Sequence, residues 1–324
     1  MKRIVSLLLA AVMLFAAVSA LAEPMKVGEL IYLNTDNESR GKMLATIESI
    51  LKEKGGYLFG VDDEIQTVFF DNLNTMQMAL ESNQIDTMIL YSKVGSYLAM
   101  QTHAFSVGQK ASEYSEPTST GSENYQMILP VLDQILGTDF AFLLREDDTA
   151  LRDEFNQAIA AMKEEGLFDK LMNEQFDAVR EGKPLEAAEI PAIDGTAVIK
   201  VAVTGDLPPM DYIDEEGKPA GFNTAVLAEI SKRIGRNIEL VSVESGARAL
   251  ALSSGTVDVV FWTRVNKPDP DALNAMPPET AETIRNAMAS LEGIVRDATM
   301  DVPSGTILTD PYLHDIYMPV YLIR

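Results

Sequence analysis

The 324-residue chain contains no cysteine and only two histidines, His103 and His314. Without cysteine there is no disulfide framework and no thiol for lipid attachment. Two histidines without cysteine also make a poor ligand set for a metal ion. The sequence lacks the G-x-S-x-G, H-E-x-x-H, P-loop and G-x-G-x-x-G motifs, and no spacing of its aspartates singles out an acid–base pair. We therefore expect no cofactor, no metal, no catalytic residues and no enzymatic activity.

Positive charge is scarce as well. The chain has 26 lysines and arginines against 49 aspartates and glutamates, which gives a formal net charge of −23 at pH 7. Nucleic acids require clustered basic side chains, so we do not expect them as partners. The acidic residues are dispersed along the chain, and that distribution is typical of a well-solvated surface.

The chain opens with "MKRIVSLLLAAVMLFAAVSALAEP", in which Lys2 and Arg3 precede a long apolar run. Small residues end this run, and Ala20-Leu21-Ala22 fits a cleavage site before Glu23. The pattern predicts a secretory signal peptide over residues 1–22, with an uncleaved anchor helix as the alternative. No later stretch is long and apolar enough to span a bilayer. We therefore expect a soluble product, periplasmic or secreted, that is not inserted in the membrane after cleavage and carries a charge near −25 once Lys2 and Arg3 are removed.

Two segments of the chain are similar in sequence, "ALESNQIDTMIL" over residues 79–90 and "ALSSGTVDVVFW" over residues 251–262, and we call this shared pattern the repeated phrase. It could be a chance helix–turn–strand junction, but the flanking patterns repeat too. Each copy follows two predicted strands and a helix, with strands at residues 26–34 and 65–70 in the first half and at 199–205 and 238–243 in the second. The helical apolar stripes are Met43, Leu44, Ile47, Ile50 and Leu51, then Phe222, Val226, Leu227, Ile230 and Ile234. This alternation predicts two similar α/β lobes, each a mostly parallel sheet flanked by helices.

Composition shifts suggest the boundaries of these lobes. The segment "AVREGKPLEAAEIPAIDG" has proline, glycine and charge but little apolar periodicity, so we expect a linker. The predicted organisation is an α/β lobe over residues 23–139, a strand and helices over 140–177, the linker over 178–196 and a second lobe over 197–324. The second lobe carries an insertion over 266–305 with a helix from Pro278 to about Arg296, and residues 109–125 form another loop-rich stretch.

Residues 201–241, "VAVTGDLPPMDYIDEEGKPAGFNTAVLAEISKRIGRNIELV", resemble the opening of the bacterial extracellular solute-binding proteins of amino-acid ABC transporters (family 3). "VDVVFW" and "TDPYL" resemble later parts of the same lobe, and residues 140–177 are similar to the family's closing strand and helices. The resemblance implies a two-lobed, periplasmic-binding-protein-like (type II) fold. Such a protein closes its lobes around a hinge on a small solute, usually an amino acid, and presents it to a membrane permease or a sensor.

The resemblance also implies where a ligand would lie, at strand ends and at the turn that opens the first helix. Carried over to this sequence, the ligand-binding residues are Leu207, Met210, Tyr212, Trp262, Thr263, Arg264, Asn34, Thr35 and Tyr91. Each has a structural alternative. Met210 and Tyr212 could pack the lobe, Trp262 could belong to the core, and Arg264 could form a surface ion pair instead of gripping a carboxylate.

The sequence departs from the family where a zwitterion would be held. The family's arginine aligns near Pro270, its ammonium-binding aspartate aligns with Tyr91, and "LNTDNES" stands where a Gly-Thr-Thr turn is usual. We therefore expect ordinary α-amino acids to bind weakly, although the solute could still be related to an amino acid. The alternative function is a non-transport sensor or interaction module whose ligand cleft is degenerate.

The order of the halves also departs from the family, in which the lobe resembling Ile199 to Tyr312 comes first. Here the hinge-like strand "DIYMPVYLIR" follows that lobe at residues 315–324, and "MKVGELIYL" at residues 25–33 resembles the family's start of the second lobe. This order predicts a circular permutation, with two tandem half-domains as the alternative. Permutation requires both chain ends near the hinge and a set of apolar side chains packed mainly on residues 197–324. That set is Phe155, Ile159, Met162, Phe168 and Leu171.

Overall fold

The structure is a computed structural model that describes residues 23–31, 37–53, 58–59, 64–108, 133, 136–183, 187–265, the positions 273–274, 277–278, 281–282, 285–286 and 289, and residues 302–323. The predicted signal peptide, the stretch 109–125 and most of the insertion lie outside these residues. The positions described at 278, 281–282, 285–286 and 289 are helical, in agreement with the helix predicted there. Within the described ranges, no helix has the length and apolar character needed to cross a membrane.

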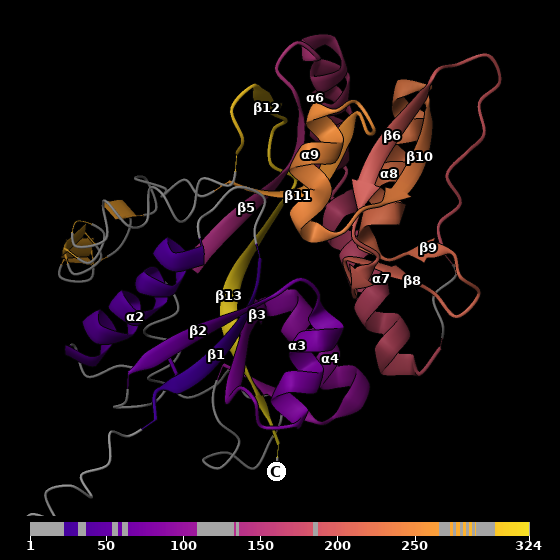
Figure 1. The fold of residues 1–324 in the computed structure, drawn as a ribbon. Coiled ribbons are helices and arrows are strands. Elements are labelled where there is room, and N and C mark those ends of the chain that lie inside the picture. The colour runs from indigo at the N-terminus through magenta and orange to yellow at the C-terminus, as the bar shows by residue number, and fades with distance from the viewer. Residues whose placement is uncertain are drawn as a thin grey trace, which may run out of the picture.

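Ten strands form one hydrogen-bonded sheet in which β13 lies at the centre (Figure 1). The path runs β10-β6-β11-β5-β13-β3-β1-β2, with β12 on β5 and β4 on β13. The strands are β1 (Met25–Leu30), β2 (Ile65–Phe70), β3 (Thr87–Tyr91), β4 (Phe105–Val107), β5 (Gly137–Arg145), β6 (Val198–Val203), β10 (Asn237–Ser242), β11 (Val259–Val265), β12 (Thr306–Leu308) and β13 (Leu313–Leu322). We call β1–β4 the β1 group, and β5, β6, β10, β11 and β12 the β6 group. A small separate sheet contains β7 (Asp206–Leu207), β8 (Asp211–Ile213) and β9 (Pro219–Ala220).

The predicted parallel pairing is present in both groups. β1 pairs in parallel with β2 and β3, and β6 pairs in parallel with β10 and β11. Antiparallel pairing occurs where β5, β12 and β13 join. The fold is therefore a mixed α/β fold, as the alternating pattern predicted.

Helices form where the apolar periodicity of the sequence predicted them, and they cover the strands. They are α2 (Asn37–Glu53), α3 (Leu73–Glu81), α4 (Ser92–Thr102), α6 (Thr149–Glu164), α7 (Leu167–Glu181), α8 (Phe222–Ile234) and α9 (Arg248–Ser253), preceded by the 3₁₀ turn η2 (Ser245–Ala247). The stripes of α2 and α8 are buried, except that Ile234 is half-buried and the side chain of Ile50 lies outside the described part. One boundary differs, because α7 continues to Glu181 and ends at Gly182, whose φ of 62° suits glycine. The first residues of the predicted linker are thus helical.

The repeated phrase has one structural cause in both halves. In the first copy, the Asp86 carboxylate accepts a hydrogen bond from the backbone N–H of Lys26 at 2.8 Å. In the second, Asp258 accepts from the backbone N–H of Lys200 at 3.0 Å. Each aspartate N–H in turn donates to the carbonyl of the same lysine at 2.8 Å. The repeated aspartate therefore fastens β3 to β1 in the first half and β11 to β6 in the second, so the match is not a chance junction.

The helix α6 packs mainly on α8, whereas α7 packs on α8, α6 and α4 to similar extents. Phe155 lies edge-on to Phe142 of β5, and Phe168 lies between Phe222 of α8 and Tyr312, with ring centroids 6.5 and 5.9 Å away. The far part of α7 also reaches α4. The apolar faces of both helices thus belong chiefly to the core of the β6 group.

The two ends of the described chain lie together on the β1 group. Val320 of β13 pairs with Met88, which pairs with Gly28 of β1, so these three residues form one row across the sheet. Neighbouring strands are about 4.8 Å apart, which places the end of β13 about 10 Å from the start of β1. This edge lies opposite the carboxyl ends of β1 and β3. The expectation that both ends lie near the hinge is therefore wrong, because β13 runs past its crossing point to the far edge.

His314 lies at the start of β13 between two carboxylates. Its Nδ1 is 2.8 Å from Asp139 Oδ1 and its Nε2 is 2.9 Å from Asp133 Oδ1. Hydrogen bonds to Asp133 and then Asp139 raise the pKa of His314 from 6.5 to about 10, against a smaller opposing effect of burial. The protonated imidazolium therefore strengthens the β5–β13 contact.

We predict that His314→Gln destabilises the protein most below pH 6.5 and that the effect fades as the pH rises towards 10. The folded pKa exceeds the unfolded one, so the stabilisation is complete below the unfolded value and is lost through the folded value. Urea unfolding at pH 6 and pH 10 measures this difference. His103→Gln is the matched control, since it removes the other histidine, which is exposed at the end of α4. A loss of stability that is equal at both pH values would contradict this role.

Candidate ligand-binding cleft

A cleft lies between the β1 and β6 groups, where the carboxyl ends of their parallel strands face each other. The cleft together with the solvent-open space at its mouth amounts to about 490 Å³. Its lining consists of Leu30, Ile31, Asp71, Asn72 and Tyr91 from the first group, with Val203, Thr204, Asp206, Leu207, Asp211, Ser245, Arg248, Phe261 and Trp262 from the second half. This is the place where open α/β sheets bind ligands.

Three of the sequence-predicted residues meet in this cleft, namely Tyr91, Leu207 and Trp262. Four others do not line it. Met210 and Thr263 are fully buried, Tyr212 is half-buried, and Arg264 is buried with its guanidinium carbon 5.7 Å from the ring centroid of Tyr317. Asn34 and Thr35 lie outside the described residues, although they follow Ile31, which does line the cleft.

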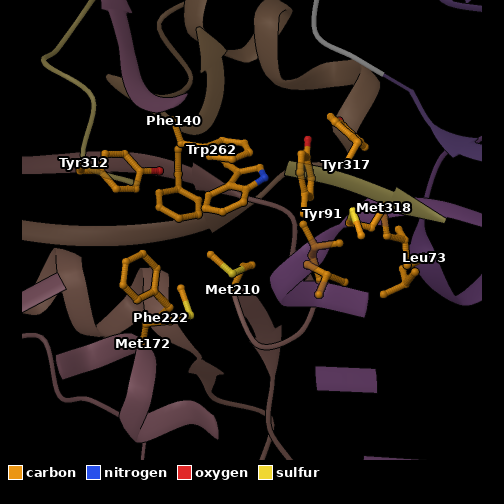
Figure 2. Close-up of a cluster of buried hydrophobic side chains, with 14 of the residues drawn as sticks. Leu73, Tyr91, Phe140, Met172, Met210, Phe222, Trp262, Tyr312, Tyr317 and Met318 are labelled. Carbon is orange, nitrogen blue, oxygen red and sulfur yellow. The ribbon is translucent and has the colours of Figure 1, made fainter. Parts of the chain in front are cut away.

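Trp262 lines the cleft and lies beside the rings of Phe140 and Tyr91, with which it forms an aromatic row (Figure 2). Its ring stacks on Phe140 with centroids 3.6 Å apart, and Tyr91 meets both rings edge-on at 5.0 and 5.5 Å. The register of β11 against β5 shifts between Val260 and Thr263, and the backbone φ of Trp262 is 64°. Such a conformation is strained for a bulky residue and is found disproportionately at functional sites. Because of this irregularity, the side chain of Trp262 does not follow the regular alternation of side chains between the two faces of the sheet, and its indole lies in the aromatic row.

Asp211, which no sequence pattern indicated, is 3% exposed and lines the cleft. Its Oδ2 accepts hydrogen bonds from the N–H groups of Thr204 and Gly205 at 2.6 and 3.1 Å. Its Oδ1 has no hydrogen-bond partner among the described residues. Burial raises the pKa of Asp211 from 3.8 to about 6 despite these hydrogen bonds, and the charge of Asp206 adds to the rise. No motif marks this residue, because its burial depends on a fold that one sequence does not reveal.

Arg248 is the cationic residue of the lining, and it too was missed. Its Nη1 donates to the carbonyl of Phe261 at 3.1 Å, and its Nε donates to the carbonyl of Ser245 at 3.3 Å. The bond to Phe261 holds the start of α9 against the middle of β11. The sequence had proposed Arg264 as the carboxylate-binding cation, whereas the structure brings Arg248 to the cleft.

The chemistry of the lining suits binding more than catalysis. Among its described residues there is no histidine, cysteine or lysine, and its ionisable groups are Asp71, Asp206, Asp211, Arg248 and Tyr91. Across the described part of the chain, no group of three or more histidines, cysteines, aspartates or glutamates is placed to hold a metal ion.

Comparison with known families identifies one part of the chain. Residues 199–271 match the family model of the bacterial extracellular solute-binding proteins, family 3. The match spans β6 to β11 and contains all nine of the cleft-lining residues from the second half. That family consists of extracellular solute-binding proteins and not of enzymes, which agrees with the expectation from the motifs. No curated protein matches the chain in sequence.

Several solved structures show a distant likeness to the chain. The ligand-binding component of an ABC-type import system from Staphylococcus aureus has 9% identity and a TM-score of 0.38, and the comparison covers 92% of this chain and 65% of that one. The periplasmic aliphatic sulphonate binding protein SsuA from Escherichia coli has 12% identity and a TM-score of 0.35, covering 93% and 65%. The VFT2 domain of BvgS from Bordetella pertussis has 10% identity and a TM-score of 0.36, covering 91% and 78%. The chain thus spans 65% of the length of the first two proteins.

We predict that Asp211→Asn gains stability relative to the wild type as the pH rises from 4 to 7. The folded pKa of about 6 exceeds the ordinary 3.8, so the wild type loses stability as this carboxyl ionises. A difference of about two pH units corresponds to about 3 kcal/mol, which is the expected relative change in the free energy of unfolding. Urea unfolding across this range measures it, with the exposed Glu239→Gln as the matched control. A difference that does not vary with pH would disprove the assignment.

Proposed function

We propose that this protein is an extracytoplasmic solute-binding protein whose β1 and β6 groups act as two lobes that close on a small molecule. It then presents the solute to the membrane permease of an ABC transporter. The observation that carries the proposal is the cleft between the carboxyl ends of parallel strands from both groups. The family match over residues 199–271 supports the same conclusion.

The connection between the groups supports closure by a hinge. In the described residues, β13 is the strand that pairs with both groups, through Leu313–Ile316 on β5 and Tyr317–Val320 on β3. Few connecting strands allow two bodies to rotate about a small number of residues. The groups already approach at the edge of the cleft, since a Cβ placed on Gly246 would lie 3.2 Å from Cδ1 of Ile31.

Within this proposal, Tyr91, Leu207 and Trp262 contact the solute, and the carboxylates of Asp206 and Asp211 supply polar contacts. Asn34 and Thr35 stay predicted ligand residues, because their segment follows directly on Ile31. Met210 and Thr263 support the cleft from the core instead.

We further propose that the order of the lobes is a circular permutation of the family's order. Packing of α6 and α7 on α8 supports it, because in the family the corresponding terminal helices return to the first lobe. The described ends do not lie near the hinge, so that expectation of a permuted chain fails. The end of β13 and the start of β1 are nevertheless only about 10 Å apart, which supports permutation because the ends to be joined must be close to each other.

We predict that a thermal-shift screen of small metabolites on the protein from Glu23 onward finds a stabilising solute. At a concentration of 100 Kd, a ligand that binds the folded state alone adds about 2.7 kcal/mol of stability. The same solute should change the fluorescence of Trp262, the single tryptophan of the chain. If no solute in a broad library changes either the thermal stability or the fluorescence, the proposal is rejected in favour of a sensor or interaction module without a ligand.

We predict that a re-ordered chain folds as the natural one does. It would run from Gly195 to Ile323, continue through about six Gly/Ser residues to Met25, and end at Lys183. A flexible linker of that length spans about 13 Å, enough to join the two strand ends. Circular dichroism and urea unfolding should give a similar cooperative transition, whereas a control chain opened inside β5, between Phe140 and Ala141, should not fold. A re-ordered chain without a cooperative transition would favour the tandem arrangement.

A further inference from the structure

The ionisable lining of the cleft is predominantly acidic. Asp71 directly precedes the N-cap of α3, while Asp206 and Asp211 lie on the paired strands β7 and β8. Arg248 is the single cation among the described lining residues, and it donates to two backbone carbonyls. The lining therefore carries three carboxylates and one arginine, and the guanidinium of that arginine already donates hydrogen bonds to the backbone. This excess of negative charge favours a positively charged solute.

A second observation concerns Asp211 alone. Its residue is 3% exposed, and Oδ1 has no hydrogen-bond partner among the described residues. A buried carboxylate oxygen without a donor is costly, and natural structures avoid it unless another group supplies the donor. An N–H group of a ligand in the cleft would supply that donor.

The rest of the lining distinguishes an organic cation from a metal ion. Tyr91, Phe261 and Trp262 place three aromatic side chains beside the carboxylates. Aromatic rings together with carboxylates are the usual means of recognising alkylammonium and guanidinium groups. A metal ion would require a compact set of ligands, and the described residues contain no such set.

We propose that the cleft binds a compact organic cation, an amine or a guanidinium compound without a carboxylate, through Asp71, Asp206 and Asp211. This inference rests on the proposed solute-binding function and names its substrate class. A free α-amino acid also carries a carboxylate, which needs a cation of its own. Arg264 lies on Tyr317 away from the lining, and Arg248 holds the carbonyls of Ser245 and Phe261. The acidic lining would therefore repel that carboxylate.

The decisive experiment compares pairs of solutes that differ by one carboxylate. The probes are putrescine and ornithine, cadaverine and lysine, and agmatine and arginine, titrated into the wild-type protein by calorimetry with Trp262 fluorescence as the reporter of the cleft. We expect at least one amine to bind at least tenfold more tightly than its amino-acid partner. Because the whole chain has a net charge of −23, Mg²⁺ at equal charge concentration controls for binding to the general surface.

Variants assign the binding to these carboxylates. Asp206→Asn and Asp71→Asn should each weaken amine binding about tenfold or more, because each removes a charge near the solute. Glu239→Gln makes the same change of charge on an exposed site of β10 and should leave the affinity unaltered. Asp211→Asn should weaken binding as well. Since that residue also accepts hydrogen bonds from Thr204 and Gly205, its unfolding curve is measured in parallel.

The failures of the inference and of the proposed function differ. Tighter binding of the amino-acid partner in every pair, or equal weakening by Glu239→Gln and Asp206→Asn, would overturn the organic-cation assignment. If a neutral or anionic solute binds and alters Trp262 fluorescence while no amine does, the inference fails and the solute-binding function stands. If no solute of any charge binds, both fail.

Discussion

The structure depends on one strand, β13, which joins the β1 and β6 groups within the ten-stranded sheet. The first half of β13 pairs with β5 and the second half with β3, so the β1 and β6 groups share a continuous backbone connection. Asp315 lies at this crossing, 2% exposed, and accepts hydrogen bonds from the Ser92 hydroxyl and the Lys93 N–H at the start of α4. Two residues further along, Tyr317 packs on Tyr91 with ring centroids 4.6 Å apart. The crossing therefore holds the end of β3, and with it Tyr91, beside the cleft.

Burial of charge is the second constraint, and the two groups resolve it differently. Near the crossing, Arg40 donates a hydrogen bond to Glu29 at 2.6 Å, and its guanidinium carbon lies 4.9 Å from the ring centroid of Tyr317. In this buried ion pair, the positive charge of Arg40 compensates the negative charge of Glu29. In the cleft, Asp211 has backbone donors for one oxygen and no described partner for the other. Burying an incompletely paired carboxylate destabilises the fold. In a binding protein, the ligand would offset that cost, which couples closure to the presence of the solute.

Much of the fold could be predicted because it follows from local patterns. The strand at Ile65–Phe70 has the predicted bounds, and four of the five residues in the apolar stripe of α8 are buried, while the fifth, Ile234, is half-buried. The repeated phrase could be recognised as a shared plan, although its cause, the bonds of Asp86 and Asp258 to the first strands, needs coordinates. The site was harder. Trp262 reaches the cleft through a break in the register of β11, and two positions later Arg264 lies against Tyr317. Arg248 and Asp211 were missed because neither lies in a local motif, and their positions depend on contacts between distant strands.

The central claim is that the two groups close on a solute, and the absence of cysteine makes a direct distance measurement possible. Met78 on α3 and Leu250 on α9 are 66% and 70% exposed, and each helix begins at the cleft, one from each side. Spin labels on Met78→Cys and Leu250→Cys would report the separation of the groups by double electron–electron resonance. The account predicts a broad distance distribution without solute that becomes narrow and shorter when a solute of calorimetrically measured affinity saturates the cleft. A distribution that such a solute leaves unchanged would contradict it.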